Sequence, residues 1–81
     1  MKTITIKSFL VPDAPMQGFA LGRPFEIHLT DSETLRGLIQ RLFPNKWKHL
    51  GLLVINEEIA SEDSTLSEGD RLVVLPLLEG G

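Results

Sequence analysis

The sequence closes on Gly80 and Gly81, which follow a run of strand-like apolar residues and leave a terminal carboxylate with no side chain beside it. Glycine has no Cβ and accepts extended and left-handed backbone conformations that other residues avoid. A terminal glycine pair can therefore pass through a narrow channel and present its carboxyl group without steric hindrance. We expect the carboxylate of Gly81 to be the reactive group of this protein.

Few other residues have types and spacings that could do chemistry. His28 and His49 fall on separate predicted elements, with no cysteine or carboxylate at metal-ligand spacing, so neither a zinc site nor a nucleophile with its base can be assembled. Gly18 and Gly22 do not form a phosphate-binding pattern between a strand and a helix. We expect both histidines at the surface, no metal, no bound cofactor and no ATP site in the protein itself.

The segment 46–49 is the one local cluster of positive charge, and it contains the only tryptophan, Trp47. Basic residues around an aromatic ring can stack a nucleic-acid base. A lone tryptophan after a helix more commonly fills a gap in a small core, and the net charge of −3 argues against binding phosphates. We therefore expect Trp47 to pack in the core and no nucleic-acid partner.

The composition is that of one small globular domain over residues 1–81. Hydrophobic residues make up 42% and charged residues 23% of the chain, as in ordinary soluble proteins. A domain of this size buries only about 60–65% of the surface that its unfolded chain exposes, so its core is thin. The absence of cysteine excludes disulfides and fits the reducing cytoplasm, which is the expected location. The alternating N-terminal residues do not resemble a signal peptide, and no apolar run approaches the roughly 20 residues of a membrane span.

The first part of the chain predicts two paired strands separated by a long loop. Residues 2–10 and 25–30 alternate apolar and polar side chains with period two, which predicts two half-buried strands that form a hairpin. Residues 11–24 contain prolines and glycines that exclude a regular element. We expect apolar residues of this loop to fold back over the edge of the sheet, namely Met16, Phe19 and Leu21.

A helix should follow the second strand. Asp31 or Ser32 is the expected N-cap, Glu33 falls in the first turn where it suits the helix dipole, and Pro44 ends the helix. Gly37 should weaken this helix by about 1 kcal/mol relative to alanine, and nothing in the sequence explains it. The helix is predicted from an apolar stripe at positions i, i+3, i+4 and i+7, formed by Leu35, Leu38, Ile39 and Leu42.

Three further strands are predicted in the second half. The apolar run 52–55 is typical of a strand buried on both faces, and residues 59–60 could add a short edge strand. Leu66 should anchor the polar segment between them and the last strand in the core. Residues 71–75 are apolar on both faces, which predicts a strand inside the sheet whose faces are covered or serve for contact.

The order strand, strand, helix, strand, short strand, strand resembles the β-grasp, or ubiquitin-like, fold. This fold is an α+β architecture with a mixed sheet of four to five strands packed on one main helix. Individual motifs spread over nearly the whole chain resemble those of the small sulfur-carrier family, which includes the small subunit of molybdopterin synthase and the sulfur carrier of thiamine biosynthesis. These motifs are residues 54–58, Leu66, Gly69–Asp70, Leu72, Pro76 and Gly80–Gly81.

The resemblance implies a chemistry for the C-terminal tail. An adenylating enzyme of the ubiquitin-activating kind would use ATP to join the Gly81 carboxylate to AMP, and sulfur from a donor enzyme would displace AMP to leave a thiocarboxylate. In the molybdopterin branch the tail then enters the large synthase subunit, sulfur passes to a pterin precursor, and the carboxylate is regenerated. The protein would be a recycled co-substrate and small synthase subunit rather than an enzyme, and a monomer when alone.

The residues before the glycines should guide the tail into its partner. Pro76 has no N–H to donate, so strand pairing should fade there and release residues 77–81 as a protruding tail. Leu77 and Leu78 either dock in apolar pockets at the mouth of the partner's channel, with the tail as an added strand, or pack on the domain's own sheet. An acidic face either steers a basic partner or is a solvated surface, and it comprises Glu57, Glu58, Glu62, Asp63 and Glu68.

Two positions of the tail depart from the molybdopterin type. Leu77 stands where many members have a second proline, and Glu79 stands where they have a small residue, which bears on the partner that reads the tail. The long loop 11–24 favours the molybdopterin branch over transfer to thiamine or another thiolated product. Two other readings stay open: a ubiquitin-like modifier joined to lysines through Gly81, and a non-catalytic interaction module that binds through an exposed sheet face.

Overall fold

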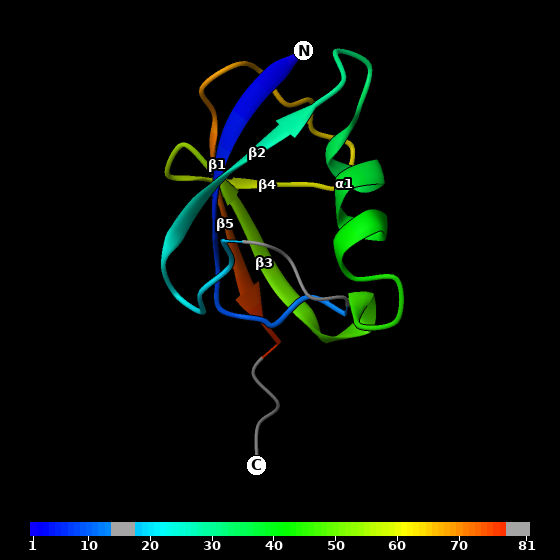
Figure 1. The fold of residues 1–81 in the computed structure, drawn as a ribbon. Coiled ribbons are helices and arrows are strands. Elements are labelled where there is room, and N and C mark those ends of the chain that lie inside the picture. Colours follow the sequence, from blue (N-terminus) through cyan, green and yellow to red (C-terminus); the bar gives the residue numbers. More distant parts are fainter. Residues whose placement is uncertain (14–17, 78–81) are drawn as a thin grey trace.

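Five strands, one α-helix and one short 3₁₀ helix make up the part of the chain that the computed structural model describes, residues 1–13 and 18–77 without the side chain of Trp47 (Figure 1). The predicted order of elements is confirmed, and boundaries shift by one to three residues. In chain order the elements are β1 (Lys2–Ser8), β2 (Pro24–Leu29), α1 (Leu35–Leu42), η1 (Trp47–His49), β3 (Leu50–Ile55), β4 (Glu58–Ala60) and β5 (Arg71–Pro76).

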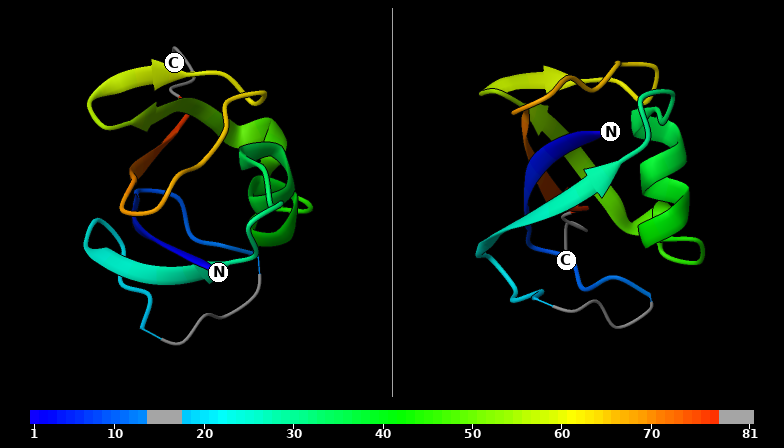
Figure 2. Two further views of the ribbon diagram at one scale, coloured as in Figure 1. Left: turned by 90° about the horizontal axis from the view of Figure 1, so that it is seen from above. Right: turned by 45° about the horizontal axis from the view of Figure 1, so that its top comes forward.

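The strands form one mixed sheet with β5 at its centre. The strand order is β2-β1-β5-β3-β4. β1 and β5 are parallel, whereas β1–β2, β3–β5 and β3–β4 are antiparallel. The predicted pairing of the first two strands and the internal position of the last strand are therefore confirmed. Figure 2 shows α1 lying against one face of the curved sheet, so the expected arrangement of one sheet on one helix is present.

β1 ends two residues earlier than the alternating pattern suggests. The buried Ser8 side chain accepts a hydrogen bond from the Leu10 N–H at 3.1 Å and donates one to the Leu10 carbonyl oxygen at 2.6 Å. A short side chain that bonds to backbone two residues ahead favours a turn over a continued strand. The chain therefore leaves the sheet at Ser8 and enters the long loop.

The helix begins at Leu35 with Thr34 as its N-cap, so the predicted caps Asp31 and Ser32 are wrong. The Thr34 Oγ1 atom accepts the backbone N–H of Gly37 at 3.1 Å, which satisfies one of the free donors of the first turn. Glu33 precedes the cap, so its predicted place in the first turn is also wrong; its carboxylate lies 3.3 Å from the Arg41 guanidinium. The helix dipole thus receives no acidic side chain in the first turn.

The core lies between the helix and the inner face of the sheet. All four residues of the predicted helical stripe are buried, as is Phe43 at the helix end. Leu66 is only 4% exposed, which confirms it as the anchor of the segment before β5. The remaining core side chains come from the strands, namely Ile4, Ile6, Ile27, Leu29, Leu53, Leu72 and Val74.

β3 is not buried on both faces, so this prediction is wrong. Leu53 points into the core, but the side chain of Leu52 is 46% exposed and those of Val54 and Ile55 are only partly buried. The helix covers one face of the sheet, and no described residue covers the other at this strand. The apolar run therefore predicts the strand correctly. How many of its faces are covered depends on the layers around the sheet, and among the described residues α1 covers one face of this strand.

The long loop covers the sheet with one of its three predicted residues in the described part. The rings of Phe19 and Phe25 meet edge to face with centroids 5.6 Å apart, a favourable aromatic geometry. Leu21 is 57% exposed, so the prediction is wrong for this residue. Met16 lies outside the described residues. The start of the loop is fixed by Asp13, whose N–H donates to the Leu42 carbonyl oxygen at 3.0 Å.

Candidate functional site

The root of the C-terminal tail, Pro76 and Leu77, is fixed to β3. Pro76 is the register partner of Leu50, and the Leu77 N–H donates to the His49 carbonyl oxygen at 2.6 Å. Neighbouring residues of a strand direct their N–H groups to opposite sides, so the missing donor of Pro76 faces away from β3. One backbone hydrogen bond therefore follows the proline, and β5 ends at Pro76, as the prediction that pairing fades there expects.

The other predicted tail residues, Leu78, Glu79, Gly80 and Gly81, lie outside the described residues. Their roles stay predictions. The structure fixes the backbone as far as Leu77, which leaves four residues between the last ladder bond and the terminal carboxylate. Fully extended, four residue steps span at most about 13–14 Å.

An apolar groove of about 430 Å³ runs beside the tail root. Leu52 and Leu77 contribute half-exposed side chains, and Gly51 lets the backbones of β3 and β5 approach closely. Leu75 and Pro76 complete its lining. Leu77 thus lies on the domain's own sheet and still has half of its surface free, so both predicted roles, packing and docking, are open to it.

The groove continues into an apolar surface on the outer face of the sheet. Val73 of β5 is in register with Val54 of β3, and Val54 is in register with Ile59 of β4, so these three side chains share the face away from α1. Ile59 is 73% exposed and the two valines are partly buried. Exposed contiguous apolar surface of this kind marks a contact site. We call Leu52, Val54, Ile59, Val73 and Leu75 the outer apolar face.

The sequence carried one signal for this face. Residues 71–75 are apolar on both sides, which left open whether the second side is covered or used for contact. Only the structure shows that the described residues leave it uncovered. The alternation within β3 and β4 alone does not reveal that Ile59 joins the same surface, because that requires the strand register.

Three residues of the predicted acidic face, Glu57, Glu58 and Glu68, lie far from the tail root. Glu57 lies in the β3–β4 turn with a left-handed backbone at φ of 74°, and Glu58 is the first residue of β4. The Glu68 carboxylate accepts the backbone N–H of Thr3 at the start of β1. Each of these positions is at the end of the sheet opposite to the end of β5 (Figure 1).

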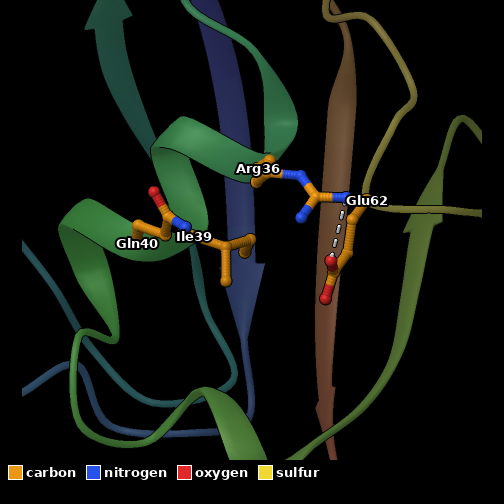
Figure 3. A pocket seen from close by; sticks show the side chains of 4 residues that line it. All are labelled: Arg36, Ile39, Gln40 and Glu62. Carbon is orange, nitrogen blue, oxygen red and sulfur yellow. Dashed lines mark ion pairs between the residues drawn. The ribbon is translucent and has the colours of Figure 1, made fainter.

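The other two acidic residues, Glu62 and Asp63, lie near α1. Glu62 lines a small cavity of about 180 Å³ beside this helix (Figure 3). Its lining includes Ile39, Gln40, and Arg36 paired with Glu62 at 3.4 Å. Asp63 lies 3.0 Å from the same guanidinium. Two carboxylates already pair with the Arg36 guanidinium, so this cluster has a structural role. Its ion pairs hold α1 to the segment after β4.

The histidines do not form a reactive group within the described part of the chain. The Nδ1 atom of the exposed His28 lies 2.9 Å from the hydroxyl of Thr3, its cross-strand neighbour. His49 is exposed in η1. No three His, Cys, Asp or Glu residues among those described could hold a metal ion. The predicted core packing of Trp47 concerns a side chain outside the described part.

The described helix is too short and too polar to cross a membrane. The pKa of Asp31 is lowered, first by a hydrogen bond from the N-terminal ammonium group and then by its charge, with a 2.9 Å contact between the two groups. This carboxylate lies at the end of the sheet opposite to the tail root. It has no part in the candidate site.

Comparison with known proteins identifies relatives of this chain. The family model described as ThiS family matches residues 19–81. A solved structure described as molybdopterin converting factor, subunit 1, from Pyrococcus furiosus superposes with a TM-score of 0.63 at 18% identity, over 96% of this chain and 100% of that one. SAMP1 from Haloferax volcanii superposes with a TM-score of 0.62 at 18% identity, over 98% and 99%. No curated protein matches the sequence. The two structural likenesses confirm the β-grasp, ubiquitin-like fold.

Proposed function

Since the chain belongs to the ThiS family, we propose that it is a sulfur carrier whose Gly81 carboxylate becomes a thiocarboxylate. The observation that supports this proposal most strongly is the tail root. The backbone is held to β3 as far as Leu77, beside an apolar groove. Four residues follow in the sequence, and the last two of them are the glycine pair. This arrangement presents a slender acyl end from a rigid base.

The proposed chemistry needs activation, because a carboxylate is a poor acyl donor. A carboxylate oxygen of Gly81 attacks the α-phosphorus of ATP bound to the adenylating partner, and pyrophosphate leaves. A sulfide-level sulfur nucleophile from a donor enzyme then attacks the acyl carbon; the C–S bond forms and the C–O bond to AMP breaks. No change of oxidation state occurs on the carrier, which itself holds no ATP.

The partners bind to the outer apolar face and to the groove. An extended tail that enters a channel binds through main-chain hydrogen bonds, which are not specific for its sequence. Apolar side chains near the tail root supply the specificity. Leu52, Leu77 and Ile59 are exposed apolar side chains in this region. We infer that Pro76, Leu77 and Leu78 contact the channel mouth while the outer face contacts the body of the partner.

We further propose that the sulfur goes to a pterin precursor of the molybdenum or tungsten cofactor. The partners would then be the adenylating enzyme, a sulfur-donor enzyme and the large subunit of molybdopterin synthase. Support comes from the long loop between β1 and β2 and from the fold likeness, over its whole length, to the protein described as molybdopterin converting factor, subunit 1. We place the reaction in the cytoplasm, with which the cysteine-free sequence is compatible.

Mass spectrometry of the protein from its native host tests the proposal. We expect a fraction with the oxygen-to-sulfur mass increase, mapped to the C-terminal peptide, and its loss in Gly81→Ala. Gly37→Ala is the matched control, because this glycine lies on the helix and its variant should carry sulfur like the parent. Lysine-linked larger species without the mass increase would instead support a protein modifier. If Gly81→Ala leaves molybdenum-enzyme activity in the host intact, the proposed transfer to a pterin precursor is wrong. If the parent protein carries no oxygen-to-sulfur mass increase, the carrier proposal itself is wrong.

A further inference from the structure

The topology brings four cationic side chains to the end of the sheet where the tail begins. β1 and β5 run parallel, and β2 and β3 run antiparallel to them. The C-terminal ends of β1 and β5 therefore lie beside the N-terminal ends of β2 and β3 (Figure 1). Lys7 precedes the end of β1, Arg23 precedes β2, and Lys46 and Lys48 precede or lie within η1 before β3. We call these four residues the cationic collar.

The contacts of Lys7 with Phe9 and of Lys46 with Val11 do not neutralise the charges of the two lysines. The Lys7 ammonium lies 5.5 Å from the centre of the Phe9 ring, and the Lys46 ammonium donates to the Val11 carbonyl oxygen at 3.1 Å. Neither partner carries a negative charge. Asp13 is an acidic side chain at this end, and its Oδ2 atom already accepts two backbone N–H groups, at 2.7 and 3.2 Å. Lys7 and Arg23 form no ion pair with another described residue.

Several acidic residues lie at the opposite end of the sheet. Asp31 follows β2, Glu57 and Glu58 turn the chain after β3, and Asp70 precedes β5. Five residue steps along β3 correspond to about 17 Å, which is roughly twice the Debye length of about 8 Å at physiological salt. A partner that approaches the tail therefore meets positive charge, although the whole chain has a net charge of −3.

We propose that the cationic collar docks on an acidic rim around the channel of the enzyme that activates Gly81. This inference rests on the proposed function and names the chemistry of the partner. The reach of the tail decides which part of the partner the collar can touch: four residue steps place the carboxylate up to about 13–14 Å beyond Leu77. Screening makes the collar ineffective at the bound nucleotide over that distance, so it acts on the rim.

The cationic collar also orients the carrier as it approaches the adenylating enzyme. Complementary charge across an interface raises the association rate more than it raises affinity. A carrier with positive charge at the tail end and negative charge at the far end turns its tail towards an acidic entrance before contact. Three residues of the predicted acidic face, Glu57, Glu58 and Glu68, lie at the far end of the sheet, away from a partner that approaches the tail.

The test measures association of the carrier with the adenylating enzyme purified from the same host, by stopped flow at about 20 mM and about 0.5 M salt. In Lys7→Glu/Arg23→Glu we expect association about tenfold slower at low salt, with the dependence on salt abolished or reversed. Adenylation at saturating carrier should stay within about twofold of the parent. Circular dichroism verifies the fold, and Lys7→Arg/Arg23→Lys should restore the parent rate.

The control Glu57→Lys/Glu58→Lys reverses two charges at the far end and should leave the association rate within about twofold. Equal rates for the collar variant and the parent at low salt overturn the inference. So does a far-end variant that accelerates association as much as the collar variant slows it, because net charge would then explain both. Failure of the parent to be adenylated at any salt concentration is a different result, which overturns the proposed function itself.

Discussion

Because Gly51 on β3 has no side chain, the tail root can approach it closely, and Gly51→Ala tests this directly. A Cβ at this position would lie 2.5 Å from the Pro76 carbonyl oxygen, 2.9 Å from its carbon and 3.1 Å from the Leu77 nitrogen. These are backbone atoms, which cannot rotate away as a side chain would. The alanine variant must therefore push the end of β5 outward, and the 2.6 Å bond from the Leu77 N–H to the His49 carbonyl oxygen lengthens or breaks.

The cost follows from these two effects. A lost backbone hydrogen bond costs about 1 kcal/mol, and overpacking costs about 1–3 kcal/mol. Because the contact lies at the end of the sheet, where the chain can shift, we expect the lower part of the second range. The variant should lose about 2 kcal/mol of unfolding free energy, which lowers Tm by about 8–16 °C in a domain of this size.

Thermal and denaturant unfolding measure this loss, and amide exchange at Leu77 reports the broken bond. Gly37→Ala is the matched glycine variant, since its Cβ would meet Thr34 Oγ1 at 3.4 Å and Glu33 Cγ at 4.0 Å, which are ordinary contacts with side chains. It should gain about 0.5–1 kcal/mol from the helix propensity of alanine. A Gly51→Ala protein with unchanged Leu77 exchange and stability within about 0.5 kcal/mol of the parent would refute the reasoning.

Three further predictions concern the fold. Thr34→Ala removes the N-cap bond and should cost about 1 kcal/mol in chemical denaturation, whereas a parent-like midpoint would mean that the cap is dispensable. Leu66→Ala should cost roughly 3 kcal/mol because its side chain is buried in the core; a loss near that of an exposed leucine such as Leu21→Ala would contradict the anchor role. NMR titration should give a pKa for Asp31 below its ordinary value, and salt should raise it. The small stabilisation by its ammonium contact is present above the ordinary carboxyl pKa and lost as pH falls through the lowered one; an unshifted titration would exclude the contact.

The sequence by itself determined the local elements, and it predicts a reactive carboxylate at Gly81. Alternating residues specify β1 and β2, a stripe of four apolar residues specifies α1, and both-sided apolarity specifies β5 as an inner strand. These signals are readable because the period of side-chain direction is a property of each element alone. The glycine pair is equally local, since the freedom of Gly80 and Gly81 needs no neighbour.

Other features depended on groups that are distant in the chain. Asp31, Ser32 and Thr34 can all cap a helix, and only the packing of the helix on the sheet selects Thr34. The apolar run around Leu52 predicts that this residue is buried. It is half exposed, because α1 covers only one face of the sheet. Likewise, Pro76 stays in the ladder because its missing donor faces away from β3.

The surface of the proposed site was decided by tertiary structure in the same way. The outer apolar face requires the register that aligns Val73, Val54 and Ile59 across three strands. The cationic collar requires the parallel pairing of β1 with β5, which brings Lys7 to the end from which the tail continues. Period and propensity act over a few residues, whereas strand order and register arise from contacts between segments tens of residues apart. The sequence alone could therefore suggest the proposed reactive end but not the surface beside it.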